Sequence, residues 1–131
     1  MIVPFLLGSK VDLDHAKVIA KALDDYGVKC EIYVSSAHKV PEKTLEIIKK
    51  FNEKKETVVW VTMAGRSNAL SGLVSANSHF PVIACPPFKD YADYLANVHS
   101  SLQMPGETPA MTVVDPKNAA QAVVRILALA D

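Results

Sequence analysis

The sequence contains few of the features that mark specialised classes of protein. It has two cysteines, Cys30 and Cys85, and no CxxC pair. We therefore expect no disulfide framework and interpret both as small buried hydrophobes. Lys plus Arg number 14, as do Asp plus Glu. This zero net charge argues against a nucleic-acid partner, which needs a basic surface, and it adds no long-range repulsion between copies of the chain.

Long hydrophobic runs and familiar catalytic motifs are also missing. No segment approaches the ~20 apolar residues of a membrane span. The apolar residues 1–7 are too short for a signal peptide and run into a turn at Gly8. We therefore expect a cytoplasmic protein without a membrane partner. The sequence contains no HExxH motif, no paired Cys/His spacing, no Walker or dinucleotide-binding glycine pattern and no GxSxG, so no metal site is expected.

Half of the residues are hydrophobic, as in a packed domain, and 131 residues correspond to a single domain, 1–131. Strands are expected at residues 2–7, 28–34, 57–63, 81–85 and 110–114. Helices are expected at residues 12–26, 41–52, 68–77, 91–102 and from 116 onward, the first capped by Asp12 and the second packing through Leu45, Ile48 and Phe51. This alternation predicts an α/β fold, a three-layer α/β/α sandwich around a doubly wound parallel sheet of about five strands.

Polar residues gather where the first three expected strands end. In chain order the groups are Gly8, Ser9, Lys10 and Asp12; Ser35, Ser36, His38 and Lys39; and Gly65, Arg66, Ser67 and Asn68. Ligands bind beyond the carboxyl ends of the strands in an open parallel sheet, so the three groups are expected at one site. Their hydroxyls, cations and helix-terminal amides suit a phosphorylated, hydroxyl-bearing small molecule.

His38 is the candidate for proton transfer. It follows a strand, between small residues and a lysine, and an imidazole exchanges protons near neutral pH. We interpret His15, His79 and His99 as surface or packing residues. Position alone leaves a structural role for His38 open, and Ser9 and Asp12 could equally be turn and helix-cap residues.

Several stretches, in the right order over nearly the whole chain, resemble the PurE-like family of phosphoribosylaminoimidazole carboxylases and mutases. They are residues 8–12 (GSKVD), 36–41 (SAHKVP), 64–72 (AGRSNALSG), 81–87 (PVIACPP), 100–105 (SSLQMP) and 118–120 (NAA). The resemblance implies a flavodoxin-like fold, no cofactor, and His38 as general acid/base. It also implies that the ribonucleotide is held by Ser9, Asp12, Ser36, Lys39, Gly65, Arg66, Ser67 and Asn68.

The family has two branches. One rearranges N5-carboxyaminoimidazole ribonucleotide and carries an arginine after the histidine. The other carboxylates 5-aminoimidazole ribonucleotide directly with CO2, in purine biosynthesis, and carries SAHK and AGRSN. This sequence has Lys39, and Ala69 stands where the mutase has its second histidine. It is therefore similar to the direct carboxylase, with the mutase as the alternative on the same fold.

Some positions depart from the family pattern. Val11 replaces a serine of the first loop, and residues 106–108 differ from the run of residues usual in the family. We expect these departures to affect the affinity for the substrate more than the chemical step. The C-terminal extension of many relatives is expected to be missing. A flavodoxin- or receiver-like binding module is a remote alternative, but a receiver needs acidic residues after the first and third strands, where Gly8 and Gly65 stand.

The resemblance also implies a homo-oligomer, an octamer. The proline-rich stretch between Pro81 and Pro109 carries Phe88, Tyr91 and Tyr94, and aromatic residues on irregular segments often anchor interfaces. The alternative is that these aromatic side chains cover the core of their own domain.

Overall fold

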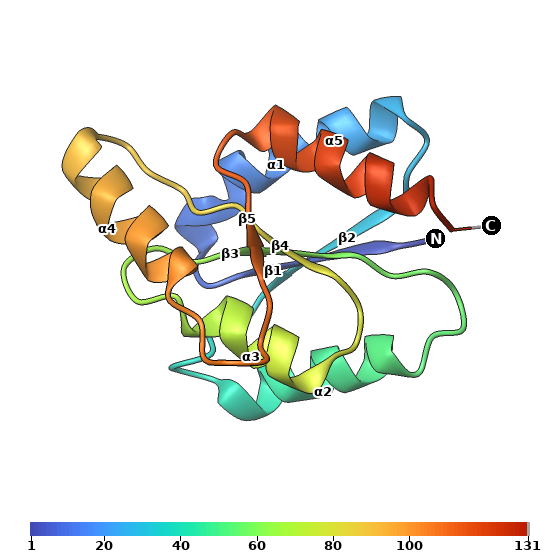
Figure 1. Ribbon diagram of the computed structural model, residues 1–131, viewed down its shortest axis with the longest axis horizontal. Coiled ribbons are helices and arrows are strands. Elements are labelled where there is room, and N and C mark those ends of the chain that lie inside the picture. Colours follow the sequence, from blue (N-terminus) through green and yellow to red (C-terminus); the bar gives the residue numbers. More distant parts are fainter. Residues whose placement is uncertain (131) are drawn as a thin grey trace.

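The computed structural model describes residues 1–130 and confirms the alternation of strands and helices (Figure 1). The strands are β1 (Val3–Leu7), β2 (Cys30–Val34), β3 (Trp60–Met63), β4 (Val82–Ala84) and β5 (Met111–Thr112). They form one parallel sheet in the order β2-β1-β3-β4-β5. The chain moves outward in one direction from β1 to β2 and in the other direction from β3 onward. Ligands bind where a sheet of this kind changes direction, beyond the carboxyl ends of β1 and β3.

Within residues 1–130, five α-helices connect and follow the strands. They are α1 (Leu13–Asp25), preceded by the short 3-10 helix η1 (Lys10–Asp12), α2 (Pro41–Asn52), α3 (Ala69–Asn77), α4 (Tyr91–Leu102) and α5 (Pro116–Leu127). In Figure 1, α1 and α5 cover one face of the sheet, α2 and α3 cover the other, and α4 lies apart at the left. Within residues 1–130, none of these helices is both long enough and apolar enough to cross a bilayer.

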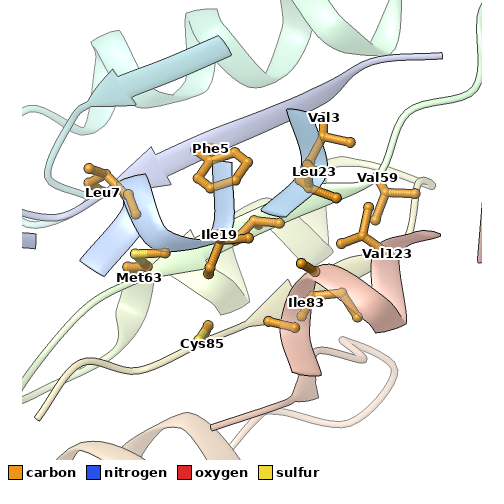
Figure 2. Close-up of a cluster of buried hydrophobic side chains, with 14 of the residues drawn as sticks. Val3, Phe5, Leu7, Ile19, Leu23, Val59, Met63, Ile83, Cys85 and Val123 are labelled. Carbon is orange, nitrogen blue, oxygen red and sulfur yellow. The ribbon is translucent and has the colours of Figure 1, made fainter. Parts of the chain in front are cut away.

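Each face of the sheet buries its own hydrophobic cluster. On one face Val3, Phe5 and Leu7 of β1 pack with residues of α1 and α5, among them Ile19 and Val123 (Figure 2). On the other face Ile2 and Leu6 pack against α2 and α3 with Trp60, Phe51 and Leu70. Alternate residues of β1 therefore serve opposite layers, as the pleat of a strand requires, and both faces are covered, as in other parallel sheets.

Two local expectations differ from the structure. Leu45 was expected to face the core, yet it is 39% exposed, and Thr44 is buried in its place. The Thr44 hydroxyl lies 2.7 Å from that of Ser35, which turns this face of α2 towards the end of β2. Asp12 occupies the N-cap position of α1 but its side chain makes no capping hydrogen bond. In the turn before it, the Ser9 side chain caps η1 by accepting from the Val11 backbone N–H.

The remaining helix ends follow from local sequence. Pro41 and Pro116 occupy the first turns of α2 and α5, where a missing N–H costs nothing. Asp90 and Asp115 accept backbone hydrogen bonds at the starts of α4 and α5, at 2.8 and 2.9 Å. Gly27 follows α1 with a φ of +72°, a left-handed conformation that favours glycine.

Candidate functional site

A cavity of about 760 Å³ lies beyond the carboxyl ends of β1 and β3. The loops after β1, β2 and β3 all contribute to its wall. The predicted site residues that line it are Ser9, Asp12, Ser36, His38, Gly65, Arg66 and Ser67. The structure thus brings most of the three polar groups to a single place.

The structure does not bring Lys39 and Asn68 to the cavity. Lys39 lies at the start of α2 beside Pro41 and Glu42, and its backbone N–H donates to the Ser36 hydroxyl at 3.2 Å. The turn after β2 therefore directs residue 39 away from the cavity. Asn68 is buried, and its side chain is fully occupied within the protein. Its Oδ1 accepts from the Ser71 amide at 3.0 Å, and its Nδ2 donates to the Ser71 and Ser101 hydroxyls at 2.9 Å.

His38 joins the second loop to the third. Its Nε2 lies 3.3 Å from the backbone carbonyl oxygen of Ser67. A carbonyl oxygen only accepts, so Nε2 carries the hydrogen, and in the neutral ring Nδ1 carries the free lone pair. The imidazole is solvent-exposed and lines the cavity. It can therefore both hold a defined tautomer and exchange a proton with a bound molecule.

The fourth loop and α4 also line the cavity, which the sequence reasoning missed. Their contributions are Pro87, Phe88, Lys89, Asp93 and Asn97. The rule that strand ends share one edge of the sheet could have found them, because β4 is parallel to β3. Lys89 supplies a cation on this wall, besides Arg66.

Asp12 is a buried carboxyl group of the cavity wall, 5% exposed. Burial raises the pKa of Asp12, and a hydrogen bond from the backbone of Ser9 partly opposes this. Desolvation disfavours the charged form. A ligand that donates hydroxyl hydrogen bonds to the carboxylate would restore the interactions that burial removes.

His15 also lines the cavity, although its sequence position indicated only surface or packing. Its Nε2 lies 3.5 Å from Sγ of Cys85. Burial lowers the pKa of His15, with an opposing effect from a hydrogen bond to the Cys85 backbone. Burial also raises the pKa of Cys85 to about 12, so the thiol stays protonated and unreactive at neutral pH. Both cysteines are free, as predicted, although Cys30 is only partly buried.

No three side chains of His, Cys, Asp or Glu within residues 1–130 are grouped as metal ligands. The polar wall consists instead of serine hydroxyls, the imidazoles of His15 and His38, three carboxyl groups and the two cations Arg66 and Lys89. Such a set can bind an anionic, hydroxyl-bearing molecule and move one proton.

Known proteins resemble this chain in both sequence and structure. The chain is 52% identical over 126 residues to the phosphoribosylaminoimidazole carboxylase of Archaeoglobus fulgidus, covering 96% of this chain and 68% of that one. It is 41% identical to a bifunctional phosphoribosylaminoimidazole carboxylase/succinocarboxamide synthetase of Rattus norvegicus, covering 95% of this chain but only 29% of the rat protein.

The crystal structure of Treponema denticola PurE superimposes with a TM-score of 0.92 at 39% identity, covering 99% of this chain and 82% of that one. The match extends over the sheet and its helices, so the flavodoxin-like α/β fold is confirmed. The sequence model of the AIR carboxylase family matches residues 2–131. The chain belongs to the AIR carboxylase family.

Proposed function

We propose that this chain is a phosphoribosylaminoimidazole carboxylase that converts 5-aminoimidazole ribonucleotide and CO2 into 4-carboxy-5-aminoimidazole ribonucleotide, in purine biosynthesis. One observation carries the proposal. The loops after β1, β2 and β3 converge on one cavity of about 760 Å³, and His38 lies in its wall. The family membership and the name of the Archaeoglobus relative support it.

The cavity offers a distinct partner for each part of the ribonucleotide. Hydroxyls of Ser9, Ser36 and Ser67, with backbone amides near Gly65, suit the phosphate, and Arg66 or Lys89 supplies positive charge. The buried carboxyl group of Asp12 suits the ribose hydroxyls. In this proposal Lys39 and Asn68 act indirectly, since the Lys39 amide fixes Ser36 and Asn68 anchors the third loop.

The reaction needs positioning and one proton transfer. The aminoimidazole ring is an enamine whose C4 attacks the carbon of CO2, forming the new C–C bond. Holding both reactants together removes translational freedom and supplies several kcal/mol of the barrier. The tetrahedral C4 then loses its proton to His38 Nδ1, because Nε2 is held by the Ser67 carbonyl. Arg66 and nearby amides stabilise the new carboxylate, and no cofactor is required.

His38→Asn tests the assignment. The variant should retain the fold and bind nucleotide, while kcat falls by ~10² or more because the proton acceptor is lost. His99→Asn is the matched control, since His99 is an exposed histidine of α4 that does not line the cavity. Near-native turnover in purified His38→Asn would refute the role of this imidazole.

The mutase reaction is the alternative on the same fold. Lys39 after the histidine and Ala69 at the start of α3 favour the direct carboxylase in the sequence comparison of the two branches. One assay separates the two reactions. 5-Aminoimidazole ribonucleotide with CO2 should be converted, whereas the N5-carboxylated ribonucleotide without added CO2 should not be rearranged.

The proposal includes a homo-octamer. Phe88 and Tyr91 are exposed, and Tyr94 packs edge-on against Phe88 with ring centroids 5.1 Å apart. These rings thus stand outside the hydrophobic clusters of their own domain, where they can contact a second copy. Light scattering should give a mass near eight times the 14.2 kDa of one chain. An active protein of single-chain mass would contradict the octamer.

We also place the protein in the cytoplasm. Phosphorylated ribonucleotides carry charge and do not cross membranes, so an enzyme acting on them works where they are made. The two free cysteines agree with a reducing compartment. Fractionation of cells that express the tagged protein should recover it with the cytoplasmic contents, and recovery outside the cytoplasm would contradict this placement.

A further inference from the structure

α4 is the helix whose buried residues are all polar. They are Asn97 and Ser101, whereas each of the other α-helices buries apolar side chains. Tyr91, Leu95 and Leu102 of α4 are exposed. Buried polar side chains cost free energy unless they are hydrogen-bonded. The partners of the polar side chains therefore reveal what α4 holds in place.

Asn97 connects α4 to two loops of the cavity. Its Oδ1 accepts from the backbone N–H of Arg66 at 2.7 Å, and its Nδ2 donates to the backbone carbonyl of Pro87 at 2.6 Å. The N–H can only donate and the carbonyl can only accept, so the orientation of the amide is determined. A Cβ at Gly65 would lie 3.3 Å from Nδ2, and glycine therefore permits this close approach.

The residue that Asn97 holds has an unfavourable backbone conformation. Arg66 has a φ of +65°, in the left-handed region, which residues other than glycine seldom adopt. The surrounding contacts must stabilise such a conformation. The hydrogen bond from the Arg66 backbone N–H to Asn97 is one such contact.

The conformation of Arg66 affects the groups that meet the ligand. Arg66 lines the cavity, and the next residue, Ser67, supplies the carbonyl oxygen 3.3 Å from His38 Nε2. If Arg66 relaxed to a right-handed conformation, its guanidinium and the Ser67 carbonyl would both move. A displacement of about 1 Å at a reacting group can cost 10²-fold in rate.

We propose that Asn97 is a positioning residue, which holds Arg66 in its left-handed conformation and thereby places the Arg66 side chain and the Ser67 carbonyl that orients His38. The inference rests on the proposed function for its consequence in turnover. The hydrogen bond through which Asn97 positions Arg66 does not depend on the identity of the substrate.

Two variants of similar size test the hydrogen bond. Asn97→Leu removes both the acceptor and the donor to the Pro87 carbonyl, whereas Asn97→Asp loses only the donor and keeps an oxygen for the Arg66 amide. We expect kcat/KM to fall by about tenfold or more in Asn97→Leu and by only a few-fold in Asn97→Asp. Val123→Ala, on the buried face of α5, controls for lost stability and should leave kcat/KM unchanged. Equal losses in the leucine and aspartate variants, or an equal loss in Val123→Ala, would overturn the proposal.

A double-mutant cycle tests whether Asn97 acts through Arg66. Glycine adopts a positive φ without strain, so Arg66→Gly should lower kcat/KM through the lost guanidinium yet make the hold unnecessary. Adding Asn97→Leu to Arg66→Gly should then cost less than about threefold, and equal fold-losses in both backgrounds would refute the coupling. If Asn97→Leu alone fails to fold, the step from Arg66→Gly to the double variant still decides the question, because a loss above about threefold in that step refutes the coupling.

Amide hydrogen exchange provides a readout independent of activity. The Arg66 amide should exchange at least about tenfold faster in Asn97→Leu than in the native chain, while amides of α5 are unchanged. If the native chain failed to carboxylate 5-aminoimidazole ribonucleotide, the proposed function would fail, and this exchange rate would still decide the role of Asn97. An unchanged exchange rate of the Arg66 amide would refute the proposal that Asn97 positions Arg66.

Discussion

Helices α4 and α5 have the same length but are held to the protein in opposite ways. α5 buries Ala119, Ala120, Val123 and Leu127 against the sheet. α4 buries Asn97 and Ser101, and these form hydrogen bonds to the third and fourth loops or to the Asn68 side chain. One helix completes a hydrophobic layer, and the other organises the wall of the cavity.

The two helices separate the stability of the fold, to which α5 contributes, from the precise placement of the cavity loops, to which α4 contributes. Apolar burial is non-directional, so α5 can shift slightly and still keep most of the stabilising free energy that comes from burying its apolar face. Hydrogen bonds depend strongly on distance and angle. The hydrogen bonds of α4 therefore fix the positions of the loops that it contacts, although α4 buries little apolar surface. A polar inner face is therefore suited to a helix that carries a binding site.

The largest loss of stability should come from the apolar helix. Leu127→Ala on α5 removes a buried side chain, 3% exposed, and should lower the free energy of unfolding by about 2–4 kcal/mol. Turnover at a temperature where the variant is folded should not change, because Leu127 does not line the cavity. Urea denaturation and steady-state kinetics measure the two effects. A loss of turnover in the folded variant would break the distinction between the helices.

A smaller loss is expected for Ser101→Ala on α4, although the substitution makes the helix more apolar. The Ser101 hydroxyl accepts from Asn68 Nδ2 at 2.9 Å and donates to the Asn97 carbonyl at 3.0 Å. Its removal leaves a buried amide hydrogen without this partner, at a cost of about 1–2 kcal/mol. Urea denaturation measures this loss. An unchanged or increased stability would mean that hydrophobic contacts, not hydrogen bonds, hold α4.

The difference between α4 and α5 also explains what the sequence could predict. The helical spacing of Val123 and Leu127 points directly to a buried face, and the same spacing located α1. A short apolar run that ends at Gly8 located β1. The polar groups after β1, β2 and β3 met at one cavity because parallel strand ends share an edge. The contact of Asn97 with Arg66 joins residues 31 positions apart, and no local pattern encodes it. Lys39 and Asn68 fail to line the cavity for a similar reason, since the turn geometry and the partners Ser71 and Ser101 decide where they lie.

Asp12 extends the comparison to the loop after β1. Burial raises the pKa of this carboxyl in the folded protein, so its contribution to stability is most favourable below the ordinary pKa of an aspartate and is lost as the pH rises through the folded value. At neutral pH the native chain carries the full cost. Asp12→Asn should therefore be more stable at pH 7, by less than the loss in Ser101→Ala, and the gain should vanish in acid.

The same variant should bind ribonucleotide more weakly, because the amide is a poorer acceptor for ribose hydroxyls. Thermal unfolding between pH 3 and pH 7, together with KM, measures the two effects. A gain of stability that persists unchanged in acid would contradict the assignment to the titration of Asp12. If both expected effects are found, Asp12 is a site residue that improves ligand binding at the expense of stability.

The smallest effect should come from Leu45, where burial and sequence pattern disagree. Helical spacing placed Leu45 on the core face of α2 with Ile48, but it is 39% exposed whereas Ile48 is 1% exposed. Leu45→Ala should change the free energy of unfolding by no more than about 0.5 kcal/mol, and Ile48→Ala on the same helix should cost about 2–4 kcal/mol. Parallel urea denaturation of the two variants gives the difference directly. Similar losses would mean that Leu45 is covered in solution, either by a different rotation of α2 or by a second copy of the chain, and dilution would separate these causes because only the second depends on concentration.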